Sequence, residues 1–152
     1  PGNIGVGGWH QTGLILNGPL SEHGANGYYL FASQRLWYRH PMVDASGISG
    51  FLQYGKNDST VLAMTKFLGG GLTAFGLTPN RPDDSMGVGL AFSWLNQNSF
   101  SQRTELLCQA YYQAKIATGL YLEPVLSYIP TPGALPNLDP SWAGTLRAIV
   151  LF

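Results

Sequence analysis

The side chains that could do chemistry in this sequence are spaced singly along the chain and recur at alternate positions. In residues 28–39, which read YYLFASQRLWYR, Arg35 and Arg39 share the odd positions, and Glu105 and Gln109 share the odd positions of a later stretch. Alternate positions lie on one face of a β-strand. Isolated polar groups on such a face can hydrogen-bond a passing polar solute, but they do not make a catalytic group.

The sequence carries no motif for an active site, a metal site or a nucleic-acid site. His10, His23 and His40 lack metal-ligand spacing. The glycine-rich stretches at 5–8 and 87–90 are not followed by helix signals, as phosphate-binding loops are, and no serine lies in a nucleophile elbow. Lys plus Arg equals Asp plus Glu, and no basic stretch is interleaved with aromatic residues. We therefore predict that the protein is not an enzyme and that it binds no metal, no cofactor and no nucleic acid.

Alternation with a period of two recurs along most of the 152 residues, whereas no stretch keeps a helical period. This pattern predicts an all-β chain of one domain, with about eight antiparallel strands joined by loops and tight turns. The expected strands are 3–16, 27–39, 47–56, 60–77, 87–95, 103–117, 119–129 and 141–152. The expected loops are 17–26, 96–102 and 130–140, with a tight turn at 117–119.

The apolar faces of these strands match lipid better than they match a soluble core. Tyr28 and Tyr38 are ten residues apart, as are Trp142 and Phe152. Ten residues in a strand tilted by about 40° rise about 25 Å, the height of the apolar band of an outer-membrane barrel. Charged residues make up 11% of the chain, against about 25% in a soluble domain. The terminal Phe152 is similar to the assembly signal of bacterial outer-membrane proteins, so we predict a transmembrane β-barrel in the bacterial outer membrane.

Several stretches, taken in order, resemble the carbohydrate-selective porin family, the OprB-like sugar porins. They are GGWHQTG (7–13), GYYLFASQRLWYR (27–39), GGGLTAFGLTPNRPDDSMGVGLAFS (69–93), TELLCQAYYQAKIATGLYLEPVLSYIPTPG (104–133) and TLRAIVLF (145–152). The chain departs from the family's pattern at Ser33, where an acidic residue would precede Gln34.

The resemblance implies a sixteen-stranded barrel, of which residues 1–152 would be the C-terminal half and an N-terminal half would be the partner. It also implies passive diffusion of sugars and other small solutes, ions included, across a membrane of lipid and lipopolysaccharide, and assembly as a homotrimer. Eight strands closed on themselves would leave an interior filled by side chains, whereas sixteen leave an aqueous channel. Unpaired edge strands are not tolerated in lipid, so either further strands exist or the eight curl shut.

The odd register of the expected strands predicts the residues that line the lumen. The candidate pore-lining residues are Arg35, Trp37, Arg39, Glu105, Gln109, Tyr111, Gln113, Lys115, Glu123 and Arg147. The family's constriction of arginines, acidic residues and aromatics implies the central role for Arg35, Trp37, Arg39, Glu105 and Gln109. The sequence leaves two roles open for each charged group, because it could contact solute or pair with a neighbouring strand and brace the wall. Arg81, Asp83 and Asp84 fall in a turn, where we expect them to pin the backbone.

Two other functions remain compatible with the same alternation. A complete eight-stranded outer-membrane barrel could serve as an anchor or adhesin, with the polar residues packed inside. A soluble β-barrel would instead bind a ligand and stay in solution without detergent. Which sugar would be preferred is not predicted by the sequence.

Overall fold

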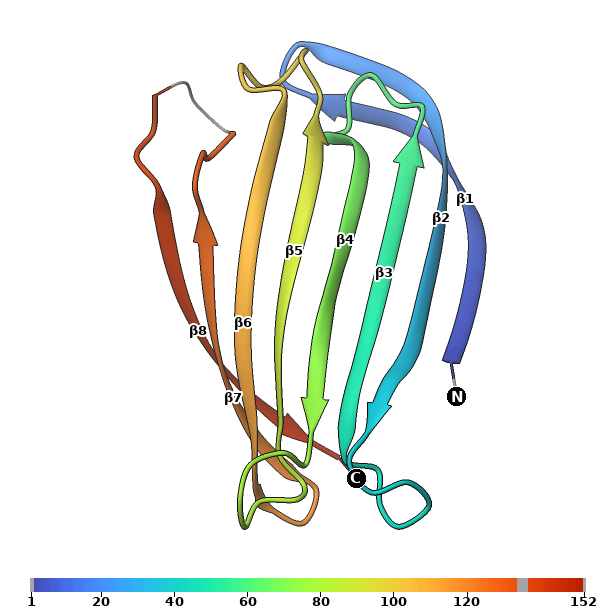
Figure 1. The fold of residues 1–152 in the computed structure, drawn as a ribbon. Helices are drawn as coiled ribbons and strands as arrows, with labels where there is room; N and C mark the ends of the chain where they lie inside the picture. The colour runs from blue at the N-terminus through green and yellow to red at the C-terminus, as the bar shows by residue number, and fades with distance from the viewer. Residues whose placement is uncertain (1, 134–136, 152) are drawn as a thin grey trace.

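The computed structural model describes residues 2–133 and 137–151, and these form one curved antiparallel sheet (Figure 1). Its eight strands are β1 (Gly2–Asn17), β2 (Leu20–Tyr38), β3 (Gly47–Asn57), β4 (Met64–Phe75), β5 (Ser85–Leu95), β6 (Thr104–Ala117), β7 (Leu120–Ile129) and β8 (Ser141–Val150). Each strand pairs with its neighbours in chain order, from β1 at one edge to β8 at the other. The predicted all-β meander of eight antiparallel strands is confirmed. Within the described ranges, no helix is long and apolar enough to cross a membrane.

The largest error in the predicted boundaries concerns the segment from residue 20 to residue 26, which was expected to be a loop and is strand. Gly18 has a φ of 59° and allows a tight turn, after which Leu20 pairs with Asn17 and His23 pairs with Leu14. The sequence here is polar because these residues lie at the rim, beyond the apolar part of the wall. The polar composition of residues 20–26 therefore reflects their position at the rim and does not indicate a loop.

The register gives the sheet two continuous faces. One row of opposite residues runs Leu52, Gly70, Leu90, Cys108, Tyr128 and Trp142 across β3 to β8, all at even positions. We call this the outer face and the face of the odd positions the inner face. Ile4 and Val6 on the outer face are 82% and 83% exposed, whereas Glu123 and Val125 on the inner face are 7% and 5% exposed. The inner face is therefore the concave, enclosed side.

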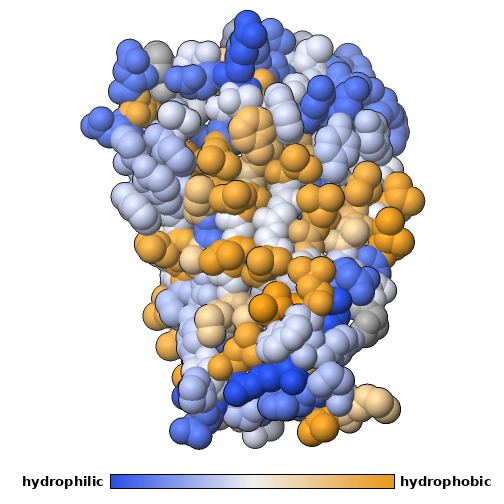
Figure 2. Space-filling model, in the orientation of Figure 1, coloured by the Kyte–Doolittle hydropathy of each residue, from blue (hydrophilic) through white to orange (hydrophobic). Residues whose placement is uncertain are grey.

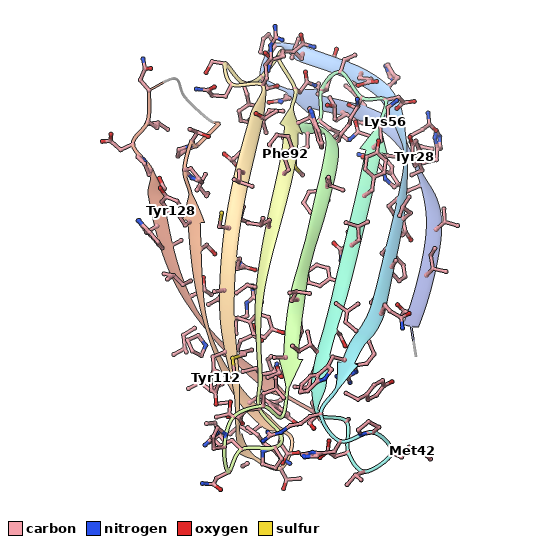
Figure 3. The ribbon with its side chains drawn as sticks, in the orientation of Figure 1. Tyr28, Met42, Lys56, Phe92, Tyr112 and Tyr128 are labelled. Atoms are coloured by element: carbon pink, nitrogen blue, oxygen red, sulfur yellow. The ribbon has the colours of Figure 1, made fainter. Side chains whose placement is uncertain are left out.

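The outer face carries a band of apolar side chains with polar residues beyond both ends (Figure 2). Aromatic pairs gather toward one end of the band, where the ring centroids of Tyr128 and Trp142 are 4.4 Å apart and those of Tyr28 and Tyr54 are 6.2 Å apart. Figure 3 places Tyr28 and Tyr128 near one end of the sheet and Tyr112 near the other. An apolar band with aromatic margins is the surface that a membrane barrel presents to lipid. Phe152, the expected terminal aromatic, lies outside the described residues.

A β-bulge near the end of β2 changes which side chains face inward. Arg35 pairs with Ser49, but Trp37 pairs with Ile48, so Leu36 is an extra residue in β2. Beyond a bulge of this kind the alternation shifts by one position. Trp37 therefore shares the outer face with Ile48, and the prediction that it faces the lumen is wrong. Tyr38 moves to the inner face instead, where its ring centroid is 5.5 Å from the guanidinium carbon of Arg35.

At the rim beside β1 and β2, the loop between β3 and β4 folds onto the inner face. Val61 packs there with Ile15 and Ala25, and these three side chains are the buried apolar cluster of the sheet. The carboxylate of Glu22 accepts hydrogen bonds from the Ser59 hydroxyl at 2.8 Å and from the backbone N–H of residue 60 at 2.9 Å. The loop is therefore held against the wall by both apolar packing and hydrogen bonds.

The sheet does not close on itself within the part of the chain that the structure describes. β1 and β8 each pair with one strand only, and they make no contact with each other. Each of these edges leaves a row of backbone N–H and C=O groups that must be paired inside a bilayer.

Candidate functional site

The inner face of β5 to β8 is crossed by a chain of polar contacts centred on Glu123. Its carboxylate accepts hydrogen bonds from Arg147 Nη1 at 3.1 Å and from Gln113 Nε2 at 3.2 Å. Ser85 Oγ lies 3.4 Å from Gln113 Oε1, which extends the chain of contacts to β5. Glu123 is buried and both of its carboxylate oxygens have partners. These contacts therefore link β5, β6, β7 and β8 to one another across the inner face.

Other predicted lining residues also have partners on neighbouring strands. Gln109 Nε2 donates to Ser127 Oγ at 3.0 Å. The hydroxyl groups of Tyr111 and Thr73 are 3.1 Å apart, which joins β6 to β4 across the glycine-rich β5. The sequence reasoning missed these small polar partners, although their odd positions in alternating strands are the signal that could have identified them.

Glu105 holds a loop rather than a strand. Its Oε2 accepts a hydrogen bond from the backbone N–H of Gly133 at 2.7 Å, and Gly133 belongs to the connection between β7 and β8. The carboxylate therefore ties this connection to the inner wall near the rim.

Arg35 lies against aromatic rings rather than against a polar partner. Its guanidinium carbon lies 4.9 Å from the ring centroid of Phe75 and 5.5 Å from that of Tyr38, so cation–π attraction holds it against the wall. Its Nη1 atom is buried and has no hydrogen-bond partner among the residues that the structure describes. A buried donor without a partner is costly, and the Arg35 side chain as a whole is only half-buried, so its guanidinium is a candidate to turn toward a solute hydroxyl.

Arg39 follows the end of β2 and is exposed at the opposite rim from Glu105. It borders a cavity of about 650 Å³ between the loop 39–46 and the loop 76–84. His40 Nδ1 and Asp44 Oδ2, in the first of these loops, are 3.0 Å apart. Arg39 is therefore placed at the mouth of the lumen and not beside Arg35 on the wall.

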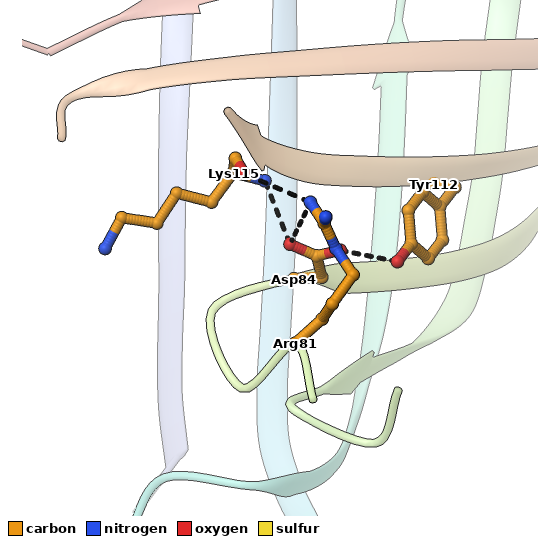
Figure 4. Close-up of polar contacts among 4 residues, drawn as sticks. All are labelled: Arg81, Asp84, Tyr112 and Lys115. Carbon is orange, nitrogen blue, oxygen red and sulfur yellow. Dashed lines mark hydrogen bonds and ion pairs between the residues drawn. The ribbon is translucent and has the colours of Figure 1, made fainter. Parts of the chain in front are cut away.

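The second of these loops is anchored by Asp84, which is 3% exposed. Its carboxylate accepts hydrogen bonds from the Arg81 guanidinium, the Tyr112 hydroxyl and the backbone N–H of Lys115 (Figure 4). The Arg81 hydrogen bonds, followed by those from Tyr112 and Lys115, lower the pKa of Asp84 to about 2. The Lys115 ammonium reaches Asp83 at 3.0 Å. The predicted pinning of this turn is confirmed, and Lys115 is one of its partners.

The structure thus separates the predicted lining residues into three groups. Glu105, Gln109, Tyr111, Gln113, Lys115, Glu123 and Arg147 contact neighbouring strands or loops, Arg35 stacks on aromatic rings, and Arg39 and Trp37 lie off the inner wall. Among the residues that the structure describes, no three His, Cys, Asp or Glu side chains converge as a metal site would require.

Comparison with known proteins agrees with this architecture. The model of the carbohydrate-selective porin, OprB family, matches residues 3–152. A solved structure of Pseudomonas putida OprB, determined at high pH, is similar with a TM-score of 0.83 and 20% sequence identity, over 99% of this chain and 44% of that chain. This chain therefore spans less than half the length of that one. The TM-score shows a shared fold, and at 20% identity the comparison shows the fold alone. None of the curated proteins matches this chain significantly.

Proposed function

Because the chain belongs to the carbohydrate-selective porin family, OprB family, we propose that it forms half of the wall of a channel for passive diffusion of sugars and other small solutes. Its family and fold are those of a channel rather than of an enzyme, and the chain is part of an integral β-barrel of the bacterial outer membrane.

The observation that carries the proposal is the division of one continuous sheet into two chemically different faces. The outer face carries exposed apolar side chains on each of the eight strands, from Ile4 on β1 to Leu146 on β8. The inner face carries the hydrogen-bonded residues of β5 to β8 and the guanidinium of Arg35. A wall of this kind separates lipid from water. A soluble ligand-binding barrel would need the reverse arrangement, with its apolar face inward.

The unpaired edges support completion by further strands. We propose that an N-terminal half supplies eight more strands, pairs with β1 and β8, and closes a sixteen-stranded barrel wide enough for water. The completed barrel would contact lipid and lipopolysaccharide through the outer face and would assemble as a homotrimer. A closed eight-stranded anchor is less well supported, because β1 and β8 do not meet.

Two measurements on protein purified from its native membrane test this proposal. The intact mass of the denatured polypeptide should be well above 16.4 kDa, or a second polypeptide of similar size should co-purify. Liposomes that contain the completed barrel should swell in solutions of neutral sugars, more slowly as the sugar becomes larger. Swelling equal to that of protein-free liposomes would overturn the proposal of a diffusion channel. A single 16.4 kDa polypeptide would favour the closed eight-stranded anchor instead.

The proposed solute contact at Arg35 predicts the effect of a substitution. In Arg35→Gln, the sugar concentration that half-blocks ionic conductance should rise about fivefold, because one hydrogen bond of about 1 kcal/mol is lost. The matched control is Arg147→Gln, since Arg147 is on the same face but is paired with Glu123. Planar-bilayer recordings of the completed barrel would measure both variants. Equal half-blocking concentrations in Arg35→Gln and wild type would assign Arg35 to bracing alone.

A further inference from the structure

Aromatic residues stand opposite glycines on the inner face of β1 and β2. Three consecutive inward pairs have this composition, and they are Gly5 with Phe31, Gly7 with Tyr29, and Trp9 with Gly27. Phe31, Tyr29 and Trp9 are 39%, 46% and 38% exposed, so their rings remain accessible from the concave side. The repeated pairing is not required by the strand pattern, which needs only alternation.

The glycines allow these rings to lie over the neighbouring strand. A Cβ atom added at Gly5 would be 2.5 Å from the ring of Phe31, and one added at Gly7 would be 2.5 Å from the ring of Tyr29. At Gly27 an added Cβ would overlap the indole of Trp9. Each ring therefore occupies the space that a side chain on the opposite residue would fill, and it extends along the wall rather than into the lumen.

The same arrangement recurs farther along the sheet. The ring of Phe51 lies over Gly71 on β4, and the ring of Tyr111 lies over Gly87 on β5. At these two glycines an added Cβ would also approach a backbone carbonyl, so they are less suitable for substitution. Gly5, Gly7 and Gly27 meet only side-chain atoms at short range.

Charge is absent from this aromatic part of the wall. Between Asn3 and Gln11 on β1, and between Gly27 and Ser33 on β2, every inward residue is uncharged. The Ser33 hydroxyl donates to the amide oxygen of Asn3, so hydrogen-bonding groups adjoin the rings. Rings beside neutral hydrogen-bonding groups suit the C–H face and the hydroxyls of an uncharged sugar.

We propose that Gly5, Gly7 and Gly27 determine the bore and the solute selectivity of the channel by keeping the Phe31, Tyr29 and Trp9 rings against the wall. The held rings form an aromatic surface along which the apolar face of a neutral sugar passes. This inference rests on the proposed channel function. A Cβ at any of the three positions pushes the opposite ring into the lumen.

The test compares Gly7→Ala with Gly8→Ala in the completed barrel. Gly8 is adjacent in β1 but on the outer face, where an added Cβ would be 3.5 Å from the nearest atom, an ordinary contact. In planar bilayers with KCl, Gly7→Ala should lower single-channel conductance by about a third, because the tyrosine ring then narrows the path. Gly8→Ala should keep the wild-type conductance. In liposomes, Gly7→Ala should slow the entry of a disaccharide more than that of a monosaccharide.

A second variant separates a displaced ring from a damaged fold. Gly7→Ala combined with Tyr29→Ala should restore conductance to the wild-type value or above, since no ring remains to enter the lumen. Unchanged conductance in Gly7→Ala, or no recovery in the double variant, would overturn the inference. If wild type conducts ions but admits no sugar, the proposed sugar transport fails, and the conductance comparison still decides the role of the glycines in setting the bore.

Discussion

Replacing Asp84 with alanine is expected to release the loop 76–84 from the barrel wall and to lower the free energy of unfolding by about 2–3 kcal/mol. The carboxylate is buried and joins Arg81, Tyr112 and the backbone of Lys115, so its removal leaves several donors without their acceptor. Urea titration of the completed barrel in lipid, followed by the different gel mobilities of folded and unfolded protein, would measure the change.

Asp83→Ala provides the matched control in the same loop. The Asp83 side chain is 59% exposed, and its ion-pair partner among the described residues is Lys115. Exposed ion pairs contribute about 0–1 kcal/mol, so this variant should unfold at nearly the wild-type urea concentration. An equal loss in the two variants would mean that Asp84 is not the anchor of the loop.

The low pKa of Asp84 determines the direction of its pH dependence. A carboxyl group whose folded pKa is lowered to about 2 stabilises the fold above its ordinary pKa of about 3.9. This stabilisation is lost as the pH falls through that value toward 2. The stability difference between wild type and Asp84→Asn should therefore be constant from pH 7 to pH 5 and should narrow below pH 4. A stability difference that stays constant down to pH 2 would contradict the claim that the ionised carboxylate of Asp84 anchors the loop.

The number of strands and the identity of their faces could be predicted because alternation is local information. Residues two apart share a face whatever the rest of the chain does, so Glu105 and Gln109 were placed correctly from their spacing. The bulge at Leu36 broke the same rule, since one extra residue moves every later side chain to the other face. Two consecutive large apolar residues, Leu36 and Trp37, were the signal that could have revealed it.

The roles of the inner residues could not be predicted in the same way. Glu123 and Arg147 share an inward register, but their pairing depends on the relative shift of β7 and β8, which the alternation within each strand does not determine. Arg35 was predicted to line the lumen, and its stacking on Phe75 joins residues forty positions apart on two different strands. Such contacts depend on the curvature of the whole sheet, which no local pattern encodes.

The outer face leads to the second large effect, because a charge placed on it must enter lipid. Leu126 on β7 is 51% exposed on this face. It lies between Ala110 on β6 and Gly144 on β8. Leu126→Arg should make folding into a bilayer less favourable by about 2 kcal/mol, because a lipid-facing arginine costs about 2–4 kcal/mol at the bilayer midplane and less toward the interfaces.

Ser127→Arg places the same side chain on the next residue of β7, but on the inner face opposite Gln109. There the guanidinium meets water and polar groups, so we expect less than half the loss of Leu126→Arg. Folding of both variants into vesicles at graded urea concentrations would compare the two faces directly. Equal losses at the two positions would mean that the even face does not meet lipid. The even-numbered residues opposite one another in β3 to β8 lie on the same face as Leu126. Equal losses would therefore contradict the assignment of this whole face to lipid, and the channel proposal that depends on it.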